Sequence, residues 1–201
     1  MPIIPGWLET KPEQPGEFKR VPAGSYVAAL DAMEAVQSKK GTTYYRIPFV
    51  ILEGEFAGTY DDDWGRDNPG LHSINLYVSN PKSVAISRGT LQTITDANPG
   101  FDADAAFQGD QFSMFKGRRV GVVLGEEEYE DRKTGDIKTS IRCRRVCSPE
   151  KAREDSAQGR VPDVKTLDGD YVDSAKYHTE KKASATTAAA VNAAKDAGVP
   201  F

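Results

Sequence analysis

"TTYYRIPFVILEGEF", residues 42–56, predicts a β-strand with two distinct faces. One face is an apolar stripe of Tyr45, Ile47, Phe49 and Ile51. This alternation is typical of a strand that buries one side against a core. The other face carries Tyr44, Arg46, Pro48 and Val50. Because a tyrosine and an arginine would point away from the core, this outer face is the first candidate for a binding surface.

The bulk properties indicate a single globular protein. The chain has 201 residues, enough for one well-buried domain with an appendage or for two very small domains. No apolar run approaches the ~20 residues that cross a bilayer, and residues 1–14 lack the pattern of a secretion signal. Two cysteines predict reduced thiols, so the expected location is the cytoplasm. The formal net charge of −4 argues against a histone-like DNA binder.

The predicted elements are five strands and two helices. The strands are expected at residues 24–36, within 42–56, and at 73–79, 118–124 and 137–147. Asn80 is the expected N-cap of the main helix, with Pro81 at its first position and a buried face of Val84, Ala85, Leu91 and Ile94. The second, short helix is "DADAAF" (102–107), and residues 53–72 predict a long loop rich in glycine and aspartate.

This order of elements predicts the fold class, which is mainly β with a helical insert. Three strands, a helix and a two-strand hairpin are the order of the OB-fold, a five-stranded Greek-key barrel. A β-sandwich with a helical insert remains the alternative. The expected domains are an extended lead-in at 1–22, the OB-fold domain at 23–148 and a flexible, alanine-rich tail at 149–201. That tail is charged and nearly free of large aliphatic residues, so it is not expected to offset the entropy of ordering.

Catalysis is not predicted, and neither is a cofactor. The two histidines, His72 and His178, have no partners at ligand spacing, and Cys143 and Cys147 on one strand are expected to be small buried hydrophobic residues. The acidic loop "YDDDW" (60–64) keeps one enzymatic alternative open, a divalent-metal nuclease that uses Asp61–Asp63. No further acidic or histidine pattern completes such a site.

Nucleic-acid binding is better supported by the pattern of the strands. With Ile74, Leu76 and Val78 inward, Asn75 and Tyr77 face outward beside Tyr44 and Arg46 of the preceding strand. Aromatic rings on a strand surface are platforms for unpaired bases, and each stacked base contributes ~1–3 kcal/mol. Trp64, in the loop between these strands, is either a further stacking group or an anchor into the core.

Cationic residues are segregated from acidic ones along the chain. The fifth strand is expected to face Ile137, Thr139, Ile141 and Cys143 inward and Lys138, Arg142 and Arg144 outward. Further cations that belong to the expected surface are Lys39 and Lys40 in the first hairpin turn and Lys116 and Arg118 at the start of the fourth strand. Acids cluster elsewhere, at 61–63 and 126–128. This segregation indicates a groove that follows a phosphate backbone.

Several short patterns resemble one family, the phage-encoded single-stranded DNA-binding proteins. They are "PAGSYVAAL", the "K-x-G" before the long strand, "ILEGEFAG" and "GRRVGV" leading into a hairpin, within roughly residues 22–148. The family was first grouped as a domain of unknown function and is found in phage recombination modules. The resemblance implies an OB-type barrel that coats single-stranded DNA without sequence preference during replication or recombination. It also implies a location in the host cytoplasm.

The C-terminal residues Pro200 and Phe201 are similar to the tail tip with which bacterial single-stranded DNA-binding proteins recruit partner enzymes. In those proteins the preceding residues are densely acidic, whereas here Asp196 stands beside Lys195. The expected partners are therefore single-stranded DNA and, through this tip, replication or recombination proteins, with no membrane. The oligomeric state stays open, a dimer being one option. A phage structural or assembly protein, with the aromatic face as a protein interface, is the alternative function.

Overall fold

The computed structural model describes residues 21–61, residue 65 and residues 68–181. The strands are β1 (Gly24–Leu30), β2 (Glu34–Gln37), β3 (Thr43–Ile51), β4 (Ser73–Tyr77), β5 (Arg119–Glu130), β6 (Ile137–Cys147), β7 (Val164–Lys165) and β8 (Tyr171–Val172). The helices are α2 (Pro81–Ala97), α3 (Ala103–Gln108) and α4 (Pro149–Ala157), with 3-10 turns η1 (Pro69–Leu71) and η2 (Phe112–Phe115) and a helix at 174–181. None of the helices in this part of the chain is long and apolar enough to cross a membrane.

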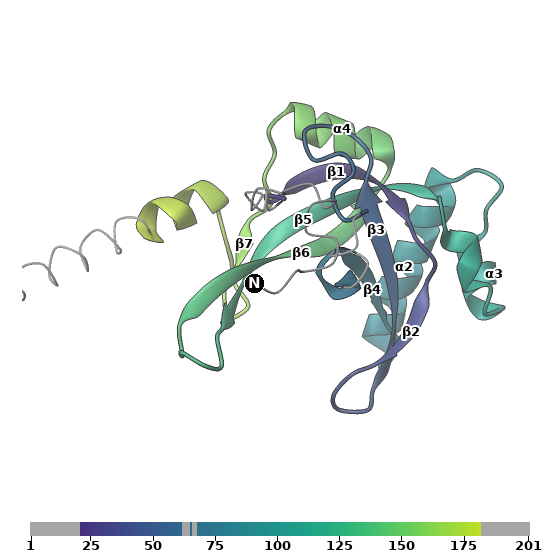
Figure 1. Ribbon diagram of the computed structural model, residues 1–201, viewed down its shortest axis with the longest axis horizontal. Coiled ribbons are helices and arrows are strands. Elements are labelled where there is room, and N and C mark those ends of the chain that lie inside the picture. The colour runs from purple at the N-terminus through teal and green to yellow at the C-terminus, as the bar shows by residue number, and fades with distance from the viewer. Residues whose placement is uncertain (1–20, 62–64, 66–67, 182–201) are drawn as a thin grey trace, which may run out of the picture.

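All eight described strands belong to one mixed sheet, which confirms the expectation of a mainly β protein with a helical insert. β1 lies between β3 and β5, antiparallel to both. β4 pairs with β3, and β6 pairs with β5 in a long hairpin. The short β7 and β8 extend the sheet beside the far part of β5. In Figure 1 the sheet curls around α2, and the β2–β3 and β5–β6 turns project in the same direction.

The sheet is open, so the expected closure into a five-stranded barrel is wrong for the described residues. β4 and β6 contact each other, but no ladder of backbone hydrogen bonds joins them. β4 has only five residues and follows the η1 turn. At this seam Arg142 of β6 donates from Nη1 to the carbonyl oxygen of Gly70 at 3.1 Å, so a side chain bridges the gap. The single sheet also differs from the two packed sheets of a sandwich.

The core lies between the concave side of the sheet and α2. The predicted inward stripes of β3 and β4 are confirmed, since Ile47, Phe49, Ile51, Ile74 and Leu76 are all buried. Two predicted inward residues, Val78 and Ile137, are exposed because each lies at or beyond the end of the part of its strand that covers the core. The expected first strand at 24–36 is divided into β1 and β2, which differ in the strands that they pair with.

The predicted start of α2 is confirmed. The Asn80 side chain accepts a hydrogen bond from the Ser83 backbone N–H at 2.9 Å, and the Ser83 hydroxyl binds back to the Asn80 backbone, which is a capping box. Leu91 and Ile94 are buried as predicted, whereas Ala85 is exposed and Ser87 is buried in its place. The Ser87 hydroxyl donates to the Tyr77 carbonyl oxygen at 2.9 Å, so α2 holds the end of β4.

Residues 149–181 are folded against the sheet, in contrast to the flexible tail expected from residue 149. Ala152 of α4 is fully buried and packs with Val27, Val123 and Cys147 on the convex side of the sheet. The composition of this segment predicts disorder, but a helix that packs against an already folded sheet is stabilised by burying only a small apolar patch. Arg153 adds two hydrogen bonds to the Glu53 carboxylate, at 2.8 and 2.7 Å. The alanine-rich segment from residue 182 lies outside the described residues.

Gly121 permits the close approach of α4, and Gly121→Ala is expected to destabilise the protein by about 2 kcal/mol. A Cβ there would lie 2.6 Å from Cys147 Sγ and from the Ser148 carbonyl oxygen, and 2.7 Å from Ala152 Cβ. Urea denaturation measures the effect. Gly89→Ala is the control, because nothing lies within 4 Å of its Cβ in α2. That change is expected to stabilise the protein by about 0.5–1 kcal/mol. Equal effects of the same sign would contradict the docking described above.

Candidate functional site

Tyr44 and Tyr77 form the centre of the outer face of β3 and β4. They are cross-strand partners, and their rings stack with centroids 5.5 Å apart and planes 28° from parallel. The guanidinium carbon of Arg46 lies 5.7 Å from the Tyr44 centroid, and its Nη2 donates to the Tyr44 hydroxyl at 2.7 Å. Tyr44 is therefore enclosed by two neighbours, whereas Tyr77 is 50% exposed. Of the two predicted stacking residues, Tyr77 presents the accessible ring.

The Arg46 side chain packs beside the Tyr44 ring and is largely shielded from solvent. Its side chain is 18% exposed and forms an ion pair with Glu34 of β2 at 3.3 Å. Its Nε is buried and has no hydrogen-bond partner in the described residues. The sequence predicts that Arg46 binds phosphate, but only a small part of its side chain is accessible to a ligand. In the structure its contacts hold Tyr44 in place.

Arg142 and Asn75 lie beside the tyrosine pair. Asn75 is the register partner of Arg46 and is exposed, and its Oδ1 accepts from the Ser73 hydroxyl at 3.4 Å. A Cβ on Gly70 would lie 3.5 Å from Arg46 Nη2, and Arg142 binds the Gly70 carbonyl. Arg142 is exposed and has no acidic partner among the described residues, so it supplies positive charge next to the rings.

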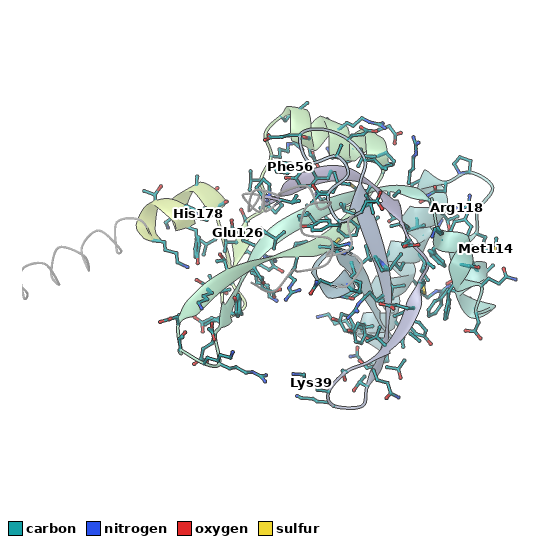
Figure 2. The ribbon with its side chains drawn as sticks, in the orientation of Figure 1. Lys39, Phe56, Met114, Arg118, Glu126 and His178 are labelled. Atoms are coloured by element: carbon teal, nitrogen blue, oxygen red, sulfur yellow. The ribbon has the colours of Figure 1, made fainter. Side chains whose placement is uncertain are left out.

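The tips of two hairpins carry further exposed cations. Lys39 and Lys40 lie in the β2–β3 turn, at the base of which Tyr44 sits. Arg132 and Lys133 lie in the β5–β6 turn, which projects in the same direction in Figure 1. None of the four has an ion pair with the described residues, and in Figure 2 Lys39 extends from the end of its hairpin. Arg132 and Lys133 are not among the residues predicted from the sequence, because nothing in a turn by itself shows that it projects beside a binding face.

Lys138 also lies on this hairpin but is neutralised locally. Its Nζ lies 2.5 Å from Asp131 Oδ2. This hydrogen bond lowers the pKa of the Asp131 carboxyl below its ordinary value and raises the pKa of the Lys138 ammonium above its own. Lys138 therefore contributes less net charge to the face than Lys39, Lys40, Arg132 or Lys133.

Lys116 and Arg118 do not join this site. Lys116 pairs with Asp31 at 3.4 Å, and the Arg118 guanidinium lies 4.4 Å from the Phe101 centroid. The Arg118 carbonyl binds the backbone of Leu30, which is the register partner of Phe49, five residues beyond Tyr44. At ~3.3 Å per residue, positions 44 and 49 of β3 are ~16 Å apart. Figure 2 likewise places Arg118 and Met114 well away from Lys39.

Arg144 extends from β6 over its partner strand β5, at the edge of β6 opposite to β4. A β-bulge leaves it without a register partner, between the pairs Val123–Arg145 and Leu124–Cys143. Its Nη2 donates to the Glu126 carbonyl oxygen, and its guanidinium carbon lies 5.2 Å from the Tyr171 ring centroid. Arg142 is the register partner of Gly125, and a Cβ on Gly125 would meet the Arg144 side chain at 2.8 Å. The two arginines therefore share the outer face of β6, as predicted.

His72 anchors the loop that leads into β4. It is buried, its Nδ1 lies 2.7 Å from the Phe49 carbonyl oxygen and its Nε2 lies 2.7 Å from the Gly65 carbonyl oxygen. Tyr60 stacks on the ring with centroids 4.4 Å apart. These contacts hold η1, and with it Gly70, against β3. The sequence offered no signal for this role beyond a histidine directly before a strand.

Other predicted residues lie outside the described part of the chain or outside the face. Trp64, Pro200, Phe201, Asp62 and Asp63 belong to the segments that the structure does not describe. The described residues contain no group of three or more His, Cys, Asp or Glu side chains placed to hold a metal ion. Cys143 and Cys147 are free thiols, and burial raises the pKa of Cys143 to about 12. Cys147 is buried, as predicted.

Comparison of this chain with family models and with curated proteins returns no match. The site is therefore interpreted from its own geometry. It consists of one accessible aromatic ring on a stacked pair, a neighbouring arginine with no acidic partner among the described residues, and two hairpin tips that carry four exposed cations.

Proposed function

We propose that this protein binds single-stranded DNA without sequence preference, through the outer face of β3 and β4. Tyr77, supported by Tyr44, stacks on a base, because every base offers a π-face to an aromatic ring. Arg142 and the cations of the two hairpin tips neutralise phosphates. A role in phage DNA replication or recombination follows from the resemblance of residues 22–148 to phage single-stranded DNA-binding proteins.

The strand pairing supports an OB-type arrangement for this domain. The pairs β1–β3, β3–β4, β1–β5 and β5–β6, with α2 between β4 and β5, follow the pairing order of a Greek-key OB barrel. The seam between β4 and β6 is bridged by Arg142 in place of a backbone ladder. In OB-folds the ligand face is the outer side of the second and third strands, flanked by two hairpin loops. Tyr44 and Tyr77 occupy that face.

A single observation carries the proposal. Tyr77 is half exposed on a face whose flanking turns carry Lys39, Lys40, Arg132 and Lys133, none of them paired with an acid among the described residues. An apolar protein interface would gain little from four exposed cations in the turns that flank it. A polyanion with exposed bases satisfies both features at once.

A fluorescence titration with poly-dT, with and without Mg²⁺, tests the proposal. We expect saturable binding that weakens steeply as salt rises from about 50 to about 200 mM, because phosphate contacts release counterions. Mg²⁺ is expected to weaken binding as any salt does, with the DNA recovered intact. Absence of binding at low salt would overturn the proposal and favour the protein-interface alternative. Mg²⁺-dependent cleavage that Asp62→Asn abolishes would favour the nuclease.

A further inference from the structure

A pocket lies on the convex side of the sheet, where α4, the bulge of β6 and β8 meet. Ser25 and Val123, both buried, form its floor. Its volume is about 510 Å³. One wall is the segment at 160–163 that leads from α4 to β7 in Figure 1, and Tyr171 stands at its edge. This pocket exists only because residues 149–181 fold onto the sheet.

Arginines dominate the polar lining of this pocket. They are Arg144, Arg145 and Arg160, and the acids beside them are Asp155 and Asp163. The Asp155 carboxylate is 4% exposed and already contacts three cations: Lys151 at 3.1 Å, Arg160 at 3.0 Å and Arg145 at 3.9 Å. Burial alone raises the pKa of this carboxyl, but Lys151 and Arg160 outweigh it, so its pKa lies below the ordinary value. Asp155 thus stays ionised and orients the arginines.

The arginines keep donors free for an anion. The side chains of Arg145 and Arg160 are 62% and 57% exposed, although both contact Asp155. A guanidinium carries five N–H donors, and the contacts with Asp155 occupy only part of them. The Nε of Arg144 is buried with no partner in the described residues. Because planar guanidinium groups bind phosphate through paired hydrogen bonds, the unused donors match an anion of that kind.

Tyr171 adds an aromatic ring to this anion-binding geometry. It is 64% exposed, and the Arg144 guanidinium supports it at 5.2 Å. Arg144 reaches this position across Gly125, where a Cβ would lie 2.8 Å from its Nε. An exposed ring beside cationic donors repeats the combination seen at Tyr77 and Arg142. A single nucleotide unit, with a base for the ring and a phosphate for the arginines, fits both parts.

A chain of contacts joins this pocket to the tyrosine face. Arg46 links Tyr44 to the neighbourhood of Gly70, and Arg142 binds the Gly70 carbonyl. Arg144 follows two residues later on β6, on the same face as Arg142, and reaches across Gly125 toward Tyr171. A bound strand that leaves Tyr77 along Arg142 therefore meets Arg144 and Tyr171 next.

We propose that the pocket lined by Arg144, Arg145, Arg160 and Tyr171 is a second nucleotide-binding site, which holds a nucleotide of the same single strand after it crosses β6. This site rests on the proposed function and extends it. The strand then runs along the convex side of the sheet, from the outer face of β3 and β4 to the pocket beside α4, and the folded C-terminal segment takes part in binding.

Oligo-dT of two lengths, about 5 and about 15 nucleotides, tests the second site, since OB folds cover ~4–16 nucleotides. With the longer oligonucleotide, Tyr171→Ala is expected to weaken binding by about 5- to 100-fold, while Tyr171→Phe keeps the ring and binds as wild type does. With the shorter one, Tyr171→Ala and wild type are expected to bind equally. Arg145→Gln is expected to lower the salt slope for the longer strand by about 0.7, and Arg88→Gln, an exposed arginine on α2, leaves it unchanged.

The failures of the two proposals differ. If wild type binds neither oligonucleotide, both proposals fall. If wild type binds and Tyr171→Ala changes nothing, or weakens both lengths equally, only the second site is overturned. Thymidine monophosphate tests the remaining alternative, a site for free nucleotides. That alternative predicts that the protein binds thymidine monophosphate saturably and that Tyr171→Ala abolishes this binding but leaves binding of the longer oligonucleotide unchanged. This result would also overturn the second site for a DNA strand.

Discussion

Replacing Tyr77 by alanine is expected to weaken binding of oligo-dT by about 5- to 100-fold, the loss of one stacked base. Tyr44→Ala is expected to weaken oligo-dT binding by a smaller factor. Tyr44 is enclosed by Tyr77 and Arg46 and contributes to binding through these two neighbours. The double variant Tyr44→Ala/Tyr77→Ala should lose most of the binding. Fluorescence anisotropy at low salt, with labelled dT, measures all three.

The controls for this series separate stacking from folding. Tyr77→Phe keeps the ring and should bind as wild type does. Met114→Ala truncates an exposed apolar residue that Figure 2 places far from Lys39, and it should change nothing. The cross-strand tyrosine pair contributes about 0.2–1 kcal/mol to stability, so every variant is expected to remain folded. Full binding by the double variant would contradict the stacking role of this face.

Neutralising the four cations of the hairpin tips is expected to reduce the salt dependence of binding. The variant carries glutamine at 39, 40, 132 and 133. Each phosphate contact on a single strand contributes about 0.7 to the slope of log affinity against log salt, so four contacts at 0.7 each give a decrease of about 2.8. Titrations with poly-dT between about 50 and about 200 mM salt measure it, and the loss of affinity should be largest at the lowest salt.

Lys116→Gln/Arg118→Gln is the charge control for the tip variant, and it removes two cations where the tip variant removes four. These two residues pair with Asp31 and Phe101 at the other end of the sheet, so their removal should leave the slope nearly unchanged. An unchanged slope in the tip variant would exclude the hairpin turns from the interface. A decrease in the control about half as large as in the tip variant, in proportion to the charges removed, would indicate that binding follows overall charge, with no defined path for the strand.

The inward stripes of β3 and β4, the start of α2 and the bounds of β6 could be predicted from the sequence. Each depends on local rules: the two-residue period of a strand, the capping preference of Asn80 and Pro81, and the turn at Gly135. The outward positions of Tyr44 and Tyr77 follow from the same period. Their pairing across two strands was an inference from topology, and the register confirms it.

The roles of Arg46, Arg118 and Arg144 could not be predicted in this way. Their partners are Glu34, Phe101 and Tyr171, which are distant in sequence or separated by a bulge, and local alternation carries no information about them. The fold of residues 149–181 was missed for a related reason. Their composition offers too little apolar surface for independent folding, but the sheet supplies the rest.

The sequence by itself determined which residues face inward in the central parts of β3 and β4 and where α2 begins, because these properties depend on neighbours two to four positions away. The tertiary structure decided which exposed cations have no acidic partner in the described part of the chain, which tyrosine keeps a free face, and that α4 completes a pocket beside Arg145. Those outcomes depend on contacts between segments up to a hundred residues apart, such as Arg153 with Glu53, and only the folded chain brings such segments together.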